Sequence, residues 1–306
     1  MDVFYGRSGE LWRGDCVSVM SWLRDFGYQA NCVVTSPPYF GLRDYGVEGQ
    51  IGLEQTPDEY VAKLVGVFRA VREVLADDGT LWLNLGDSYN NFRVSTNGQS
   101  VHSGKLKGKF DGRRPVDRNL KEKDLIGIPW RVAFALQSDG WYLRQDIIWH
   151  KPNPMPESVR DRCTKAHEYV FLLSKGPKYF YDAEAVKEKA AESTVVRLSQ
   201  NIDAQEGSSR VPGKTNGNMK AVGSDMRNRR SVWTVSTKPF KGAHFATFPP
   251  DLIEPCILAG CPVGGTVLDP FMGAGTTALV SEKLGRRWVG AEINPDYCGI
   301  AMNRLK

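Results

Sequence analysis

Two spacings of apolar residues alternate along the chain. Within residues 57–79, apolar side chains recur every three or four positions between Val61 and Leu75, with a proline near the start and a glycine at the end. This spacing predicts an amphipathic helix. Short apolar runs bounded by turn residues, such as 31–36 and 80–87, are typical of buried strands. Repeated alternation of helix and strand predicts an α/β fold.

The same criteria place further elements on either side of these. We expect additional helices at 17–26, 125–140, 249–260, 276–285 and 295–306. We expect additional strands at 9–15, 141–151, 168–175, 266–269 and 286–293.

Basic residues are concentrated in two irregular, glycine-containing stretches. The chain has 40 lysines and arginines against 35 aspartates and glutamates, a net charge of +5 that only weakly favours polyanionic partners. Within 93–124 and 187–241, basic residues clearly outnumber acidic ones. Such stretches are either solvated linkers or loops that grip a nucleic-acid backbone. In the second case Lys105 and Lys107 would contact DNA.

The six cysteines are scattered without any C-x-x-C pair, so neither a zinc site nor a disulfide framework is indicated. We expect reduced thiols and no metal. Residues 1–15 lack the basic flank and apolar core of a signal peptide, and no apolar stretch approaches the length of a membrane span. We therefore expect a soluble cytoplasmic protein that does not bind membranes.

A glycine-rich turn, DPFMGAGTT, follows the predicted strand 266–269 and precedes a predicted helix. Gly273 and Gly275 can adopt positive φ and let a ligand approach the backbone, while the helix start offers unpaired N–H groups. Glu292 ends the next predicted strand, where a carboxylate can accept hydrogen bonds from both hydroxyls of a ribose. The pattern indicates a seat for a nucleoside-containing cofactor, and an ordinary strand–turn–helix connection is the alternative.

Two classes of nucleotide fit this turn poorly. It lacks the G-K-[ST] sequence of a phosphate-binding loop and the third glycine of the dinucleotide motif. Asp269 at the strand end would repel a pyrophosphate but attract a cationic amino group. S-adenosylmethionine carries an α-amino group, a sulfonium and a ribose, so we expect it as the cofactor.

The sequence TSPPY ends the predicted strand 31–36 with a rigid, polar, aromatic corner. An exocyclic amine on a nucleobase is a poor nucleophile because its lone pair is delocalised into the ring. The Ser36 hydroxyl and the Pro37 carbonyl can accept hydrogen bonds from that amine and favour a more nucleophilic geometry. Pro37 and Pro38 fix the loop, and Tyr39 offers a flat face for an extruded base. An ordinary turn at a strand end is the alternative.

These motifs, in this order, resemble the permuted or β group of amino-methylating DNA methyltransferases, in which the catalytic SPPY segment precedes the cofactor segment DPFMGAGTT. The resemblance covers almost the whole chain and includes LWRGD, GTLWLNLGDSY, HEYVFLLSK and HFATFPPDL. It implies a Rossmann-like α/β fold with a mixed, mostly parallel sheet, one antiparallel strand and flanking helices.

The resemblance also implies roles for individual residues. Ser36–Tyr39 would form the catalytic loop, and Glu292 would hold the ribose. Asp15 resembles an acidic residue near the adenine, and Phe248 belongs to a segment that closes over the methionine tail. The residues that the family places around the methionine part of the cofactor would be Asp269, Phe271, Gly273, Gly275 and Thr276.

The resemblance further divides the chain into one methyltransferase domain with a variable segment. Residues 1–181 would form the catalytic half, including the basic loop 93–124, and 242–306 the cofactor-binding half. Base recognition in this group commonly lies between the HEYVFLLSK and HFATFP motifs, so 182–241 would be the target-recognition segment. Its candidate contacts, to bases or only to phosphates, are Arg227, Arg229 and Arg230.

Ser36 bears on which base is methylated. Family members with SPPY mostly methylate the 4-amino group of cytosine, whereas DPPY and NPPY usually accompany adenine. The resemblance therefore implies N4-cytosine methylation of double-stranded DNA, with N6-adenine as the alternative. Serine and aspartate both accept from an amino group, so chemistry alone leaves both open. The sequence is compatible with a cognate restriction endonuclease or a phage-encoded enzyme acting alone, and with a monomer or a homodimer.

Other chemistries fit the sequence less well. Ring-carbon methylation needs a cysteine nucleophile, but Cys256 lies on an apolar helical segment typical of a core. His150 and His167 are candidate bases beside predicted strands, with a structural role as the alternative. Protein and RNA methyltransferases with a proline corner usually place the glycine turn first, the reverse of the order here. A DNA-binding relative without activity is the remaining alternative.

Overall fold

The structure is a computed structural model, and it describes residues 2–90, 119–191, 225–238 and 247–306. The chain forms two compact units. The first comprises Met1–Tyr181 and Ser231–Lys306, and the second comprises Asp182–Arg230.

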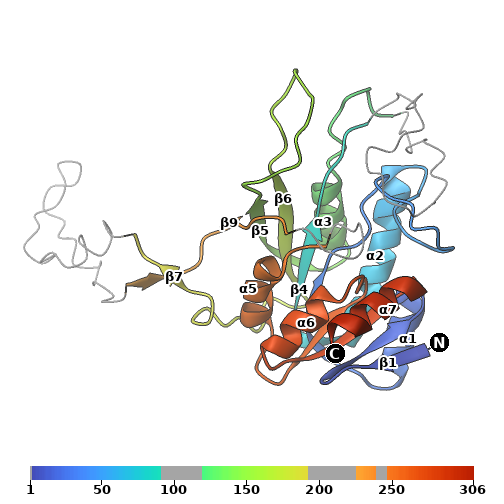
Figure 1. Cartoon of the computed structure of the whole chain (residues 1–306), viewed down its shortest axis with the longest axis vertical. Coiled ribbons are helices and arrows are strands. Elements are labelled where there is room, and N and C mark those ends of the chain that lie inside the picture. Colours follow the sequence, from blue (N-terminus) through green and yellow to red (C-terminus); the bar gives the residue numbers. More distant parts are fainter. Residues whose placement is uncertain (1, 91–118, 192–224, 239–246) are drawn as a thin grey trace, which may run out of the picture. The chain divides into compact units, whose positions relative to one another are not determined.

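The first unit is built on a nine-stranded sheet (Figure 1). Its strands are β1 (Asp2–Tyr5), β2 (Gly9–Arg13), β3 (Ala30–Thr35), β4 (Leu75–Leu85), β5 (Tyr142–His150), β6 (His167–Ser174), β9 (Val232–Thr234), β10 (Thr266–Asp269) and β11 (Arg287–Glu292). Their order across the sheet is β1-β2-β11-β10-β3-β4-β6-β5-β9. The five strands from β2 to β4 run parallel, whereas β6 is antiparallel to both its neighbours. The predicted mixed, mostly parallel sheet is confirmed, although β1 is a second antiparallel strand.

Helices cover both faces of this sheet. They are α1 (Cys16–Asp25), α2 (Pro57–Val74), α3 (Ile128–Ser138), α5 (Pro250–Gly260), α6 (Thr276–Lys283) and α7 (Pro295–Arg304). Buried residues of α1, α2 and α3 share one core cluster, and those of α6 and α7 share another. Adjacent residues of β2 point to opposite faces, so Leu11 joins the α6–α7 cluster and Trp12 the α1–α3 cluster. None of the described helices is long and apolar enough to cross a membrane.

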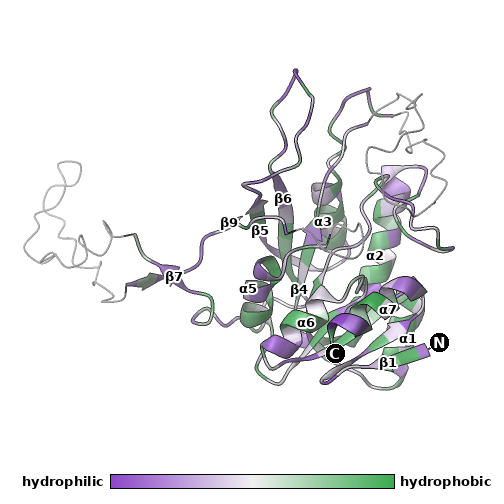
Figure 2. Cartoon of the chain, in the orientation of Figure 1, coloured by the Kyte–Doolittle hydropathy of each residue, from purple (hydrophilic) through white to green (hydrophobic). Residues whose placement is uncertain are grey.

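Hydropathy follows the layers of the first unit. Hydrophobic residues are concentrated in the central strands and in the helix sides that pack on them (Figure 2). Hydrophilic residues predominate in the long connection between β5 and β6 (Figure 2). This connection, which spans residues 151–166, is joined at its base by a 2.8 Å hydrogen bond from the Lys151 amide to the Ala166 carbonyl.

Strands β3 and β10 place the two chemical motifs of the sequence side by side. They are parallel neighbours, with Cys32 opposite Val267 and Val33 opposite Leu268. The chain leaves β3 towards α2 on one face of the sheet and leaves β10 towards α6 on the other. In parallel α/β sheets, ligands bind outside the carboxyl ends of the strands at such a divergence.

The predicted helix 57–79 is correct at its start and wrong at its end. A capping box at Thr56 and Glu59 begins α2. The helix stops at Val74, and Leu75 adopts an extended conformation and pairs with Ala30 of β3. Leu75 fits the helical spacing as well as a strand, and pairing with β3 decides between them. The short edge strands β1 and β9 were not predicted, because each carries too few residues for a clear alternation.

The described part of the second unit contains a two-stranded ribbon. Strands β7 (Glu188–Lys189) and β8 (Met226–Arg227) pair in antiparallel fashion. The Glu188 carboxylate accepts hydrogen bonds from the guanidinium groups of Arg227, at 2.9 Å, and Arg230, at 2.6 Å. The assignment of 182–241 to target recognition stays a prediction, and most of that segment lies outside the described residues.

Candidate active site

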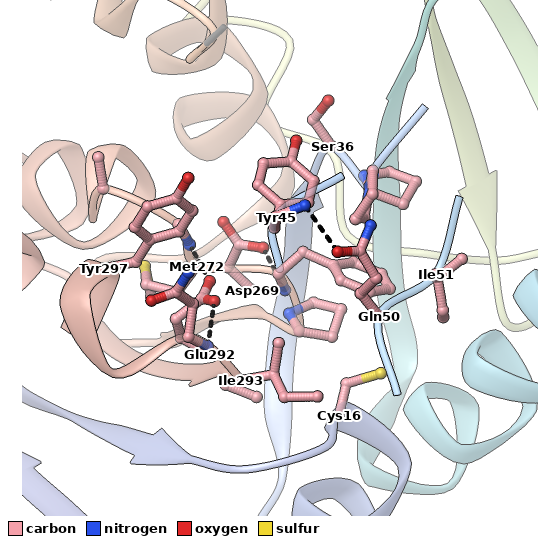
Figure 3. Close-up of a pocket in the computed structure, with 18 of the residues that line it drawn as sticks. Cys16, Ser36, Tyr45, Gln50, Ile51, Asp269, Met272, Glu292, Ile293 and Tyr297 are labelled. Atoms are coloured by element: carbon pink, nitrogen blue, oxygen red, sulfur yellow. Dashed lines mark hydrogen bonds between the residues drawn. The ribbon is translucent and has the colours of Figure 1, made fainter. Parts of the chain in front are cut away.

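One pocket lies at the carboxyl ends of β2, β3, β10 and β11 (Figure 3). The turns that follow these four strands bring Asp15, Ser36, Asp269 and Glu292 to its wall. The catalytic corner and the glycine turn therefore share one cavity, although more than two hundred residues separate them. The other predicted site residues that line it are Pro37, Pro38, Tyr39, Phe248, Phe271, Gly273 and Thr276.

The glycine turn has the backbone that its sequence predicts. Gly273 and Gly275 have φ values of 52° and 76°, in the region that favours glycine. Gly275 is the N-cap of α6, and a β-carbon there would lie 3.0 Å from the β-carbon of Ala301. The turn therefore requires glycine at position 275 both for its backbone conformation and for the close approach of α7.

Asp269 is buried and fixed by three donors. Its Oδ1 accepts hydrogen bonds from the Thr35 hydroxyl, at 2.6 Å, and the Phe271 amide, at 3.0 Å, while Oδ2 accepts from the Thr277 hydroxyl at 2.6 Å. Burial raises the pKa of Asp269 to about 6, and the two hydroxyl donors oppose that rise. With four acceptor positions on the carboxylate, one on Oδ2 is left for a further donor. A cationic amino group in the pocket fits that position.

Glu292 is held by two backbone amides. Its Oε2 accepts from Gly273 and its Oε1 from Asn294, both at 2.8 Å. Burial raises the pKa of Glu292 to about 7, against these two hydrogen bonds. Each oxygen retains one acceptor position. The side chain is thus arranged to accept from two neighbouring hydroxyls, as on a ribose.

Side chains that do not line the pocket hold the proline corner. The Tyr60 hydroxyl on α2 donates to the Pro38 carbonyl at 2.8 Å. The Tyr39 hydroxyl lies 2.7 Å from Oε2 of Glu168 and 3.1 Å from Oδ1 of Asn84. Burial, and then the charge of Glu168, raise the pKa of Tyr39, so its hydroxyl stays protonated and acts as a donor. These contacts hold the corner in place in the free protein.

An aromatic wall of the pocket was not predicted. The rings of Tyr45 and Tyr297 meet edge to face, with centroids 6.0 Å apart (Figure 3). The Tyr45 amide donates to Oε1 of Gln50 at 2.7 Å, which ties together the loop after the corner. Flat, partly apolar surfaces of this kind can hold a purine ring. Tyr297 lies in the sequence NPDY, directly after the predicted strand 286–293. That sequence was the signal from which this wall could have been predicted.

Asp15 and Thr276 line the pocket but also have structural partners. Oδ1 of Asp15 accepts from the amide and the hydroxyl of Ser18, at 3.0 and 3.2 Å, and so caps α1. The Thr276 hydroxyl accepts from the guanidinium of Arg304 at 3.2 Å. Contact of either side chain with a cofactor stays a prediction.

Five basic residues were predicted to contact DNA. Arg227, Arg229 and Arg230 belong to the second unit, and Lys105 and Lys107 lie outside the described residues. Their roles stay predictions.

The other nucleophile and base candidates lie elsewhere. Cys256 is buried on α5, in agreement with its interpretation as core. His150 Nδ1 lies 3.1 Å from the Thr234 hydroxyl, and the His167 ring packs edge-on against Tyr169. Burial lowers the pKa of His167. Neither histidine lines the pocket.

Comparison with known proteins identifies what the chain is similar to. A family model described as DNA methylase, for N6 and N4 methyltransferases, matches residues 30–303. The chain is 48% identical over 297 residues to the Type II methyltransferase M.Cfr9I of Citrobacter freundii, covering 97% of this chain and 87% of that protein. It is 49% identical over 278 residues to M.SmaI of Serratia marcescens, covering 90% and 84%.

Solved structures resemble the fold. The PvuII DNA methyltransferase, named as cytosine-N4-specific, matches with a TM-score of 0.64 at 20% identity, covering 98% of this chain and 87% of that one. M1.HpyAVI in complex with S-adenosylmethionine matches with a TM-score of 0.57 at 16% identity, covering 97% and 99%. At these identities the likeness concerns the fold alone, and the predicted Rossmann-like α/β fold is confirmed.

Proposed function

Because the chain belongs to the N6/N4 DNA methylase family and is therefore an S-adenosylmethionine-dependent DNA methyltransferase, we propose that it methylates the 4-amino group of cytosine. The proposal rests on the presence of a serine, Ser36, at the start of the proline corner. Its side chain lies on the pocket wall at the end of β3, beside Asp269 at the end of β10. The loop that would accept hydrogen bonds from the amine therefore lies next to the turn that would hold the cofactor.

The proline corner needs only to accept hydrogen bonds from the amine and to orient it. S-adenosylmethionine, when bound, supplies an electrophilic methyl group. The Ser36 hydroxyl and the Pro37 carbonyl accept hydrogen bonds from the exocyclic amine, so that its lone pair turns towards the methyl group. Direct displacement on the methyl carbon would form the new N–C bond as the bond from that carbon to the sulfonium sulfur breaks. S-adenosylhomocysteine would be the leaving group, and the methylated amine would lose one proton to solvent water. No covalent protein intermediate is needed, which agrees with the burial of Cys256 away from the pocket.

The cofactor fits the described pocket residue by residue. Asp269 would accept from the α-amino group through the free position on Oδ2, and Glu292 would accept from the ribose hydroxyls. Gly273 and Gly275 keep side chains out of the turn. Tyr45 supplies the flat surface for the adenine.

The choice of cytosine is supported by serine in the SPPY corner and by the fold shared with the cytosine-N4-specific PvuII enzyme. N6-adenine is the competing outcome, since the corner could accept from either amine.

The names of the close relatives support a place in restriction and modification. M.Cfr9I and M.SmaI are both named Type II methyltransferases. We therefore propose that this enzyme modifies a specific site in double-stranded DNA and thereby protects it from a nuclease of the same specificity. The segment 182–241 would read the site, with the arginines of β8 and its neighbours among the contacts.

The test begins with mixed-sequence duplex DNA. The purified protein is incubated with this DNA and S-adenosylmethionine, and the nucleosides released by digestion are identified by mass spectrometry. N4-methylcytosine is the expected product. N6-methyladenine would overturn the cytosine assignment while leaving the chemistry in place. If no methylated nucleoside forms on genomic DNA from several unrelated bacteria, despite measured cofactor binding, the proposed function fails.

A further inference from the structure

The hydroxyl of Tyr39 contacts polar side chains on two strands, which do not line the pocket, and it also forms a hydrogen bond with the side chain of Ser36. Asn84 belongs to β4 and Glu168 to β6, and the two strands are hydrogen-bonded neighbours. The Asn84 amide donates to the Tyr169 carbonyl at 3.0 Å and lies 3.4 Å from Oε2 of Glu168. Its Oδ1 is therefore turned towards the tyrosine. The phenol has one proton to donate, and its shorter contact, 2.7 Å to Oε2 of Glu168, sets its direction, while Oδ1 of Asn84 is a second acceptor at 3.1 Å.

Glu168 is itself held by a cation. Its second oxygen, Oε1, pairs with the ammonium of Lys151, and that ammonium lies 4.2 Å from the ring centroid of Trp149. The side chains of Glu168 and Lys151 are only 16% and 17% exposed. A cation beside a largely buried carboxylate offsets part of the cost of burying its charge. One carboxylate oxygen of Glu168 thus pairs with Lys151, and the other accepts a hydrogen bond from Tyr39.

The ring of Tyr39 lies against Gly86. A β-carbon at Gly86 would be 2.5 Å from Cε2 of the ring and 3.0 Å from Cδ2. The backbone at Gly86 does not have positive φ, so its conformation does not demand glycine. Only the closeness of the Tyr39 ring requires a residue without a side chain at position 86. Glycine there lets the ring lie close to the end of β4.

We propose that Glu168 and Gly86 are positioning residues of the methyl transfer, which fix the direction and the plane of the Tyr39 ring. Glu168 acts through the phenol, and Gly86 acts through the space it leaves under the ring. A base that stacks on Tyr39 needs the ring in one plane, since a small tilt moves the amine out of line with the methyl donor. This inference rests on the proposed role of Tyr39 in holding the extruded base.

A double-mutant cycle tests whether Glu168 acts through Tyr39. Methyl transfer from labelled S-adenosylmethionine to a DNA that the wild type methylates is measured in single turnovers, with both substrates saturating, for Tyr39→Phe, Glu168→Ala and the double variant. We expect each single change to slow transfer about tenfold or more, and the second change to add less than about threefold to the first. Effects that simply multiply would overturn the proposal.

Two further variants separate positioning from folding. Glu168→Gln keeps an acceptor for the phenol, so it should retain more of the rate than Glu168→Ala. Gly86→Ala should slow transfer at least about tenfold while the cofactor Kd changes less than about threefold, because Tyr39 is not among the residues expected to hold the cofactor. If Gly86→Ala raises the cofactor Kd as much as it slows transfer, Gly86 has no specific link to the ring.

The matched control is Asp139→Ala. The Asp139 side chain is 12% exposed and pairs with Arg69, which is 67% exposed, and neither residue lines the pocket. This variant should keep the wild-type rate, and a loss equal to that of Glu168→Ala would show that removing any largely buried, paired carboxylate slows transfer as much. Failure of the proposed function is seen separately, as a wild-type enzyme that does not methylate DNA or a Tyr39→Ala variant that is fully active.

Discussion

The hydroxyl of Thr35 donates a 2.6 Å hydrogen bond to the carboxylate of Asp269, across 234 positions of the sequence. Thr35 is the last residue of β3 and Asp269 the last residue of β10. Ser36 follows directly after the first, and the glycine turn follows the second. This hydrogen bond therefore sets the spacing between the loop that would hold the methyl acceptor and the turn that would hold the donor.

Thr35→Val should weaken cofactor binding. Valine preserves the shape and the strand preference, but it removes a donor that lowers the pKa of Asp269. Fewer carboxylates are then ionised near neutral pH, and those that are ionised are less firmly oriented. We expect about a tenfold rise in the Kd of S-adenosylmethionine by titration calorimetry. Thr35→Ser, which keeps the hydroxyl, is the control. Equal loss in both variants would contradict this account.

Cofactor affinity should fall as the pH is lowered from 7.5 to 5.5, a range that brackets the raised pKa values of Asp269 and Glu292, about 6 and about 7. The free protein favours the neutral carboxyls, whereas a bound ammonium and ribose favour the ionised forms, so binding releases protons near pH 6.5. The observable is the Kd measured across this range. Asp269→Asn should bind more weakly at pH 7.5 and show a flatter dependence. A wild-type Kd that does not change would refute the assignment.

The same two pKa values affect the stability of the free protein in the opposite direction. A carboxyl with a raised folded-state pKa stabilises the fold most below its unfolded-state pKa, and this contribution is lost as the pH rises through the folded value. For Asp269 and Glu292 the loss falls between about pH 4 and 7. Urea unfolding of Asp269→Asn should therefore show a smaller decline in stability over that interval than the wild type.

Changes in the corner should separate chemistry from cofactor binding. Ser36→Ala removes one acceptor for the amine, and Tyr39→Ala removes the stacking face. Each should reduce transfer at least about a hundredfold while the Kd of S-adenosylmethionine stays within about threefold of the wild type. Rate and Kd are measured on the same preparations. Normal activity in both variants would remove the corner from the mechanism.

Much of the site could be predicted because of where strands end. Ser36, Asp269 and Glu292 each follow an apolar run, and parallel strands bring such residues to one edge of the sheet. The strand predicted at 266–269 agrees with β10 at both ends, since a turn follows it at once.

The supporting contacts could not be predicted in the same way. Thr35, Thr277 and Glu168 matter because of what lies beside them in neighbouring strands and helices. Those neighbours depend on strand order and register, and β10 lies next to β3 only because of long crossovers. One local signal was available: Asn84 interrupts an apolar run, and a buried amide needs partners.

Two glycines at opposite ends of α6 offer a matched comparison for the cofactor turn. Gly275 before the helix and Gly285 after it have nearly equal φ values, 76° and 70°. A β-carbon at Gly275 would press on Ala301 at 3.0 Å, whereas one at Gly285 would meet nothing within 4 Å. Alanine at either position carries a similar backbone cost of about 1–2 kcal/mol. Only alanine at position 275 also pushes α7 away from the turn.

Gly275→Ala should therefore destabilise the protein more than Gly285→Ala, and it alone should weaken the binding of S-adenosylmethionine. The free energy of unfolding from urea titration gives the first comparison, and calorimetry gives the second. We expect Gly285→Ala to bind the cofactor as the wild type does, because α6 still presents the same N-terminal amides. Equal Kd values for the two variants would mean that the contact with Ala301 has no bearing on the seat, and that the turn tolerates a side chain where the cofactor is expected to lie against the backbone.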